Sequence, residues 1–419
     1  MLNWLPYIGL SLLFLNWTPP SVWAQEPPVA VAPVVWDDQP ETASTAPSLV
    51  RTDGCAVCCD TCCEPCGPAG RVWFTGEVLA WWMRGSWTPP LVTGSAPGTP
   101  LEDAGILGRP GTAILFGDER INSAVRGGFR VGMGVWLNRE QTWGLEGSFF
   151  VLSRQEDGFV ANGLGGQILA RPFFDVEANA ADSALVSFPG LVSGAVAVSS
   201  YSELLGSDFS VRRRLSCSSD CCGGRRIDLV AGFRYLRLAE QLDIYENIQT
   251  LDGDQQVPAG TRFLISDRFT TRNEFYGGQI GVMAETWQGR WFASFRGVIG
   301  LGTNRQSAQL EGSTTVIVPD LGPVTFPGGL LVQPSNLGQF NRSQFAVVPE
   351  LSFQVGCHLT DNLRVFLGYN LIWWTNVIRP GDLVDLAVDP SQVVARPAFG
   401  WNTSDAWIQG ISGGVQIRF

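Results

Sequence analysis

The stretch VRGGFRVGMGVWL, residues 125–137, decides the fold. Apart from Gly127, the odd-numbered positions are apolar: Val125, Phe129, Val131, Met133, Val135 and Leu137. Between them lie Arg126, Gly128, Arg130, Gly132 and Gly134. A period of two indicates a β-strand with one apolar face. The run is also as long as the roughly 9–11 residues that a tilted strand needs to cross a bilayer.

The same alternation recurs along the chain, for example from Ile227 to Tyr235 and from Leu363 to Leu371. We predict ten strands, at residues 72–84, 125–137, 142–153, 204–215, 226–248, 263–284, 290–317, 342–358, 362–374 and 405–419. A further hairpin within residues 154–203 would raise the count to twelve.

Alternation alone does not separate a membrane barrel from a soluble sandwich, because each has one apolar face. The connections favour the barrel. They are short at residues 138–141, 285–289 and 359–361, with a longer turn at 216–225, and long at 85–124, 154–203, 318–341 and 375–404. Short inner turns opposite long outer loops are typical of outer-membrane barrels. We expect the long loops to fold over the mouth as a cap or plug.

Aromatic residues and the last strand point the same way. We expect one interfacial girdle from Trp73, Trp136, Trp143, Trp287 and Trp291, and a second from Trp82, Trp373, Trp374 and Trp407. Apolar residues alternate from Ile411 to the terminal Phe419, an ending that resembles the signal read by the outer-membrane assembly machinery. We therefore expect that machinery and outer-membrane lipid as partners.

Several motifs resemble the beta-barrel porin-7 family of outer-membrane proteins, which is found chiefly in planctomycete bacteria. They include Trp81-Trp82, Gly147-Ser148-Phe149-Phe150, Leu169-Ala170-Arg171-Pro172-Phe173-Phe174, Gly232-Phe233-Arg234-Tyr235-Leu236, Phe345-Ala346-Val347-Val348-Pro349-Glu350 and Arg396-Pro397-Ala398-Phe399. The resemblance covers essentially residues 71–419. It implies an outer-membrane β-barrel with porin-like passage of small solutes, and it implies no catalytic or binding residues.

The first seventy residues differ from the rest. Residues 1–24 contain a short apolar run followed by Val22-Trp23-Ala24, which favours a cleaved signal peptide over a membrane anchor. Residues 25–70 are rich in proline and then in cysteine, which predicts an extended periplasmic segment.

The cysteines allow disulfides or a metal site. Three CxxC units place Cys55, Cys58, Cys59, Cys62, Cys63 and Cys66 together, and Cys217, Cys221, Cys222 and Cys357 follow at inner strand ends. In an oxidising compartment disulfides are favoured over Zn or iron–sulfur ligation. We expect the amino-terminal segment to be pinned beneath the barrel by disulfides to the inner turn, or to be cross-linked to a neighbouring protein.

The composition restricts the chemistry. None of the 28 basic residues is a lysine, His358 is the single histidine, and the net charge is −11. Lysine-based and multi-histidine sites are therefore excluded, no cofactor is expected, and nucleic acid is not an expected partner. An enzyme is disfavoured, because outer-membrane hydrolases need a histidine near the outer rim and His358 lies at the inner end of its strand.

Charged residues are predicted on the inner face of the barrel: Glu77, Arg126, Arg130, Glu146, Asp208, Arg212, Arg214, Asp228, Arg234, Arg296, Glu350, Arg364 and Arg418. Buried charges must be paired, which predicts an arginine–carboxylate network across the lumen. Barrels of about eight strands are filled by side chains, whereas open channels need about 16–18 strands. Two functions remain: porin-like passage, and a closed barrel with a structural or surface-interaction role, anchored through the cysteine-rich segment.

Overall fold

A computed structural model describes residues 70–419 except 165, 220–222 and 254–256. The signal peptide predicted at residues 1–24 and nearly all of the proline- and cysteine-rich segment predicted at 25–70 lie outside the described residues. In the described part, no helix is long and apolar enough to cross a membrane.

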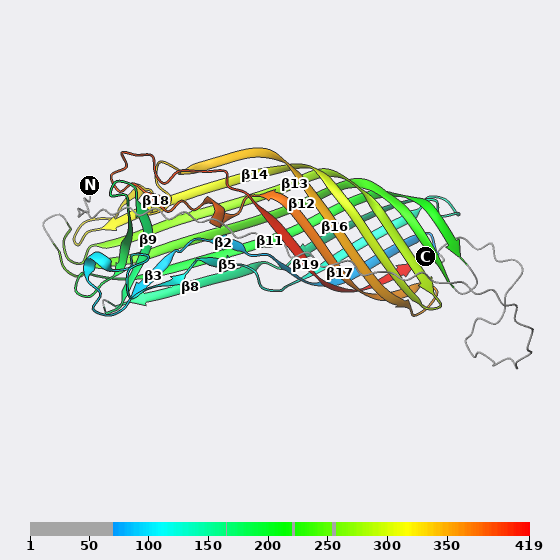
Figure 1. Ribbon diagram of the computed structural model, residues 1–419, viewed down its shortest axis with the longest axis horizontal. Coiled ribbons are helices and arrows are strands. Elements are labelled where there is room, and N and C mark those ends of the chain that lie inside the picture. The colour runs from blue at the N-terminus through cyan, green and yellow to red at the C-terminus, as the bar shows by residue number, and fades with distance from the viewer. Residues whose placement is uncertain (1–69, 165, 220–222, 254–256) are drawn as a thin grey trace, which may run out of the picture. The chain divides into compact units, whose positions relative to one another are not determined.

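Ten antiparallel strands form a closed ring (Figure 1). They are β1 (Val72–Met83), β6 (Arg126–Trp136), β7 (Trp143–Leu152), β11 (Val192–Ser219), β12 (Gly223–Thr250), β13 (Arg262–Gln288), β14 (Trp291–Ile317), β16 (Gly338–His358), β17 (Leu363–Val377) and β19 (Ser404–Arg418). Each pairs with two neighbours, and β1 pairs with β19 from Trp73–Arg418 to Met83–Ile408, which closes the barrel. The predicted count of ten is confirmed.

Residues 154–203 do contain further strands, but these add nothing to the ring. Strand β8 (Gln155–Gly163) pairs with the first part of β11, beyond the end of β7. Strands β9 (Ile168–Asp175) and β10 (Ala180–Ser187) form a hairpin in a different sheet. The main sheet has twelve strands in all, of which ten form the closed ring, and the β9–β10 hairpin finds its hydrogen-bond partners in the other sheet.

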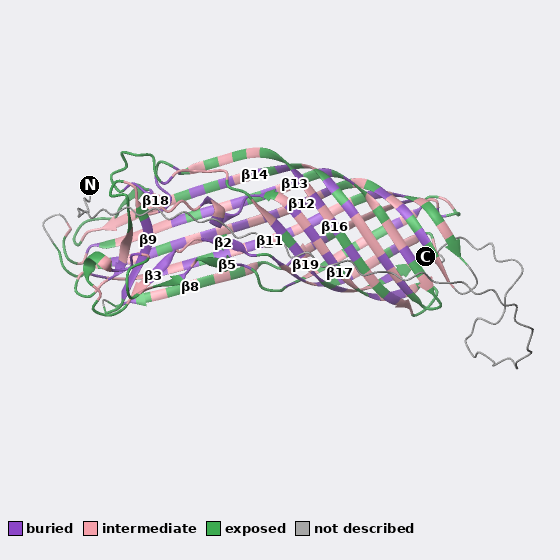
Figure 2. Cartoon of the chain, viewed as in Figure 1, coloured by how far each residue is buried: buried purple, intermediate pink, exposed green. Residues whose placement is uncertain are grey.

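Burial alternates along every barrel strand, which gives the wall a chequered pattern (Figure 2). On β6, Arg126 is buried whereas Phe129, Val131 and Met133 are exposed. Since large apolar side chains face outward and charged ones face inward, the pattern fits a wall surrounded by lipid rather than by water.

The outward apolar belt covers only part of the four longest strands. On β12 it runs from Ile227 to Tyr235, and the outward positions beyond carry Arg237, Gln241 and Asp243. Strands β11 to β14 have 27 or 28 residues each, whereas β1, β6 and β7 have 10 to 12. The long strands therefore continue well past the membrane level at the end that carries the long loops.

A small second sheet lies over that extension. It contains β3 (Val92–Ser95), β4 (Thr112–Phe116), β9, β10 and β18 (Ala387–Val388). The other loop elements are β2 (Ser86–Thr88) paired with β5 (Glu119–Ile121), β15 (Val324–Pro327) on β14, and the 3-10 turns η1 (Leu101–Asp103) and η2 (Pro380–Leu383). We call the long loops together with this sheet the cap.

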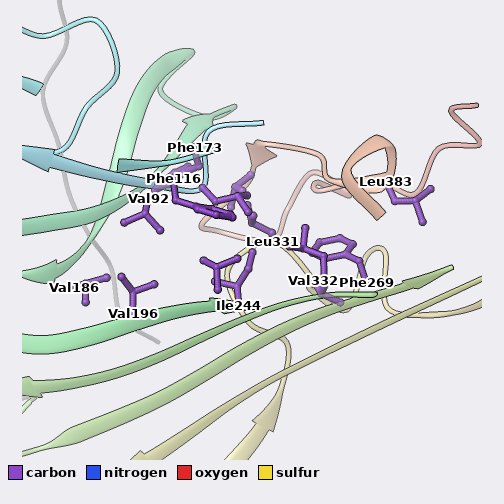
Figure 3. Packing of buried hydrophobic residues seen from close by; sticks show 14 of the residues in the cluster. Val92, Phe116, Phe173, Val186, Val196, Ile244, Phe269, Leu331, Val332 and Leu383 are labelled. Carbon is purple, nitrogen blue, oxygen red and sulfur yellow. The ribbon is translucent and has the colours of Figure 1, made fainter. Parts of the chain in front are cut away.

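The cap encloses its own apolar core against the extended strands. Val92, Phe116 and Phe173 of the small sheet meet Ile244 of β12 and Leu331 of the loop before β16 (Figure 3). Such burial, at about 25 cal/mol per Å² of apolar surface, gives the loops a fixed structure. The expectation that the long loops pack over the mouth is confirmed.

Candidate functional site in the barrel interior

The inward side chains form two distinct layers within the membrane-level wall. The layer nearest the short turns is charged. The next layer, towards the cap, is apolar. This division decides what the interior can do, because a charged layer binds water and ions whereas an apolar layer excludes them.

Glu350 on β16 lies at the centre of the charged layer and is 4% exposed. It accepts a hydrogen bond from Arg234 of β12 and lies 3.8 Å from Arg296 of β14 and 3.9 Å from Arg130 of β6. Arg130 also lies 3.9 Å from Glu77 of β1. One carboxylate thus joins arginines from three separate parts of the wall, which ties opposite sides of the ring together.

Further ion pairs extend this network. Arg212 of β11 bonds Glu146 at 3.1 Å and also pairs with Asp228 of β12. Arg296 lies 3.2 Å from Asp208, and Arg364 of β17 lies 2.8 Å from Glu285 of β13. The predicted arginine–carboxylate network is therefore present.

Three predicted members form no ion pair with a described carboxylate. Arg126 is buried towards the cap, where it donates to the carbonyl oxygens of Asn122 and Ser202 at 2.9 and 3.2 Å. Arg214 lies at the short-turn end and donates to the Glu140 carbonyl oxygen at 2.7 Å. Arg418 lines the charged layer, but its Nε donates to Gln416 at 2.9 Å rather than to a carboxylate.

The sequence prediction missed Arg226 and Glu285, although both share the inward parity of their strands. Arg226 of β12 lies 2.8 Å from Asp228 and donates to the backbone oxygen of Gln141 at 2.7 Å. Its guanidinium also lies 4.0 Å from the centre of the Trp136 ring.

Four of the predicted girdle tryptophans prove to lie in the interior. Trp73 and Trp136 are 7% and 3% exposed, and Arg212 lies over both rings. Trp287 also lines the charged layer, and Trp374 of the outer set is fully buried. The prediction was wrong for these four. At Trp73 and Trp136, inward arginines offer the ring faces a cation that lipid does not.

The remaining girdle tryptophans do face outward. Trp143 and Trp291 are 44% and 66% exposed at the short-turn end. Near the other edge of the belt, Trp373 of β17 and Trp407 of β19 stack with ring centres 4.9 Å apart. Trp82 also occupies an outward-facing position, on β1.

The apolar layer closes the barrel above the charges. Its side chains come from eight of the ten strands and include Trp81, Phe150, Leu236, Phe275, Val348 and Trp374. Trp81 and Trp374 have no exposed surface, and Phe275 meets Trp374 edge-on with ring centres 6.4 Å apart. We call this layer the plug, because its apolar side chains are buried together across the ring.

The charged layer encloses a cavity of about 140 Å³. That volume holds roughly ten water molecules, since one water needs about 10–15 Å³ by this measure. The lining reaches from Glu350 to Gln416 and Arg418 at the ends of the strands. The cavity is therefore a pocket at the short-turn end.

The cysteines are only partly described. Cys217 on β11 is disulfide-bonded, and Cys357 on β16 has a free thiol. Cys55, Cys58, Cys59, Cys62, Cys63, Cys66, Cys221 and Cys222 lie outside the described residues. Within the described ranges, no group of three or more His, Cys, Asp or Glu could hold a metal ion. Pinning of the amino-terminal segment remains a prediction.

His358 ends β16 at the short-turn end, with its ring 5.5 Å from that of Phe292. Phe419 is 66% exposed, and its backbone bonds Val72 where β1 and β19 close the ring. Both residues lie where their strands were predicted to place them.

Comparison with known families agrees with this architecture. The sequence model of the family described as "Putative beta barrel porin-7" matches residues 73–419. The chain belongs to this family. As a beta-barrel porin-7 protein it is an outer-membrane β-barrel, and the match begins at the first barrel strand and ends at Phe419.

Solved structures give only distant likenesses to this porin-7 barrel. The outer membrane protease OmpT from Escherichia coli has 8% identity, with 83% of this chain and 97% of that chain covered and a TM-score of 0.35. The Ralstonia pickettii toluene transporter TbuX has 8% identity, covers 85% and 92%, and has a TM-score of 0.17. A search of curated proteins found no match.

Proposed function

We propose that this protein is a closed outer-membrane barrel that anchors and presents the cap, with a structural or surface-interaction role, and that it passes no solute through its lumen. The observation that supports this is the plug. Its side chains fill the ring between the charged layer and the cap, and Trp81 and Trp374 are completely buried there.

The topology supports an orientation for this barrel. The start of the first barrel strand and the end of the last lie beside the short turns, where the backbones of Arg71 and Phe419 are hydrogen-bonded. In outer-membrane barrels that end faces the periplasm and the long loops face outward. The cap then lies outside the cell, and the first barrel strand begins at the periplasmic end.

Porin-like passage is the second candidate. The family description and the arginine-lined pocket favour it. Passage would require the plug to move, and its residues belong to hydrogen-bonded strands of the wall rather than to a separate segment. We also propose that the protein is not an enzyme. The reason is that His358 lies beside Phe292 at the short-turn end of the barrel, which is the end opposite the cap.

Single-channel recording distinguishes the two candidates. The full chain, folded into lipid and checked by its heat-modifiable migration in gels, is added to planar bilayers. We expect no reproducible conductance steps. Regular steps from folded wild-type protein would overturn the closed barrel and favour the porin.

A further inference from the structure

The charges around the pocket do not balance. Seven arginines and five carboxylates line it. Six of the arginines lie within ion-pair distance of a carboxylate: Arg130, Arg212, Arg226, Arg234, Arg296 and Arg364. Among the described residues, Arg418 has a hydrogen bond to the neutral Gln416 and no carboxylate partner.

The surroundings of Arg418 increase this local excess. The strongest electrostatic influences on it come from Arg364, Glu285, Arg212 and Arg226, and three of these four groups are positive. Glu285 already bonds Arg364 at 2.8 Å, and Asp228 is shared by Arg212 and Arg226. Bringing a fourth guanidinium beside these three costs free energy unless an anion accompanies it.

The neighbouring arginine also has a free donor. The Nε of Arg364 is buried and has no hydrogen-bond partner in the described part of the chain, while its guanidinium lies 4.3 Å from the centre of the Phe292 ring. A buried unmatched donor is unfavourable by about 1–3 kcal/mol until it finds an acceptor. The ring of Phe292 holds Arg364 in place, so the donor keeps its position.

We propose that the pocket binds a small oxyanion such as phosphate or sulfate, held by Arg418 and Arg364 at the short-turn end of the barrel. Planar guanidinium groups suit an oxyanion because each can give two parallel N–H donors. The cavity of about 140 Å³ has room for such an ion and a few waters. The plug blocks the other side, so the ion enters and leaves by the same end.

Inorganic phosphate is the probe for this site. The full-length protein is folded into lipid, and phosphate binding is measured by calorimetry at fixed ionic strength, with chloride as the matched salt. We expect saturable binding in the wild type and a loss of about tenfold or more in affinity in Arg418→Gln. Arg213→Gln is the control, because Arg213 faces outward at the same end, over Trp143.

Gln416→Glu gives an independent test that does not remove the arginine. A carboxylate at this position would accept the Arg418 Nε hydrogen bond and take the place of the ion, so phosphate binding should be lost while the barrel still folds. Binding no stronger than that of chloride in the wild type would overturn the proposal. So would wild-type phosphate affinity in both Arg418→Gln and Gln416→Glu.

Discussion

Arg379 and Glu240 form a doubly hydrogen-bonded ion pair although 139 residues separate them in the chain. The Arg379 Nε donates to one carboxylate oxygen at 2.8 Å and Nη2 donates to the other at 2.6 Å. Both side chains are almost completely buried, and Arg379 Nη1 also donates to the Arg84 carbonyl oxygen at 2.6 Å. This pair joins the loop after β17 to the wall strand β12 and to the chain leaving β1.

Breaking this pair should destabilise the protein strongly. Glu240→Gln leaves a buried guanidinium without its counter-charge, and we expect a loss of about 3–5 kcal/mol in the free energy of unfolding. Urea unfolding in lipid vesicles measures this change. Arg109→Gln, which removes an exposed pair with Asp103, should change it by less than about 1 kcal/mol. Equal effects of the two variants would contradict the expected role of burial.

The charged layer should depend on Glu350 more than on Glu77. Glu350 faces three arginines, whereas Glu77 faces only Arg130, at 3.9 Å. We expect Glu350→Gln to lower the free energy of unfolding by about 3 kcal/mol or more and Glu77→Gln by about 1 kcal/mol. The same urea titration compares them. A larger effect at Glu77 would mean that the network is not centred on β16.

Truncating the plug should make the barrel conduct. Trp81→Ala combined with Trp374→Ala removes two fully buried rings from the apolar layer and leaves a cavity that water can enter. We expect conductance steps in planar bilayers where the wild type is silent. The matched control is Trp82→Ala with Trp373→Ala, which changes the adjacent outward residues and should remain silent. Silence in a folded plug variant would show that another layer seals the barrel.

Acid should stabilise the loop that carries Asp382. Burial raises the pKa of the Asp382 carboxyl, despite a hydrogen bond from the Ser404 hydroxyl at 2.7 Å. A raised pKa means that the folded loop binds the proton more tightly than the unfolded chain. This contribution is therefore complete below the usual aspartate pKa of about 3.9 and is lost as pH rises through the folded value.

Hydrogen exchange of residues 380–404 tests this pH dependence. After correction for intrinsic rates, the opening free energy in the wild type should increase as pH falls from neutrality, and the increase should be smaller in Asp382→Asn. Parallel pH profiles in the two proteins would show that Asp382 keeps an ordinary pKa.

Alternation of apolar residues was enough to predict all ten barrel strands. The main error in length was at β11, which begins at Val192 instead of residue 204. Alternation is present there too, since Val196, Val198, Ser200 and Ser202 are all buried. It was hidden because both faces of this part of the strand carry small residues rather than contrasting types.

The odd or even position of each tryptophan along its strand could also have corrected the prediction of the two girdles. Trp136 shares the even positions of Arg126 and Arg130, and Trp374 shares the even positions of Arg364 and Asn370. All of these side chains lie inside the ring. A tryptophan near a strand end therefore belongs to the lipid belt only when its parity matches that of the outward residues.

The layers of the interior were not predictable in the same way. Glu77, Leu79 and Trp81 follow one another on the inward face of β1, yet Glu77 belongs to the charged layer and Trp81 to the plug. Which layer a residue joins depends on the tilt and register of neighbouring strands. Pairings such as Trp81 with Gly410 and with Arg126 are set by the closed ring rather than by local sequence.

The long strands β11 to β14 place the cap at a distance from the outward apolar belt. From Tyr235, at the edge of the outward belt, β12 continues to Thr250, which at ~3.3 Å per residue is roughly 50 Å along the strand. Its partners β11 and β13 run beside it over the same distance. Four hydrogen-bonded strands make a stiff support. In the orientation proposed above, they hold the cap clear of the lipid headgroups, where large molecules outside the cell can reach it.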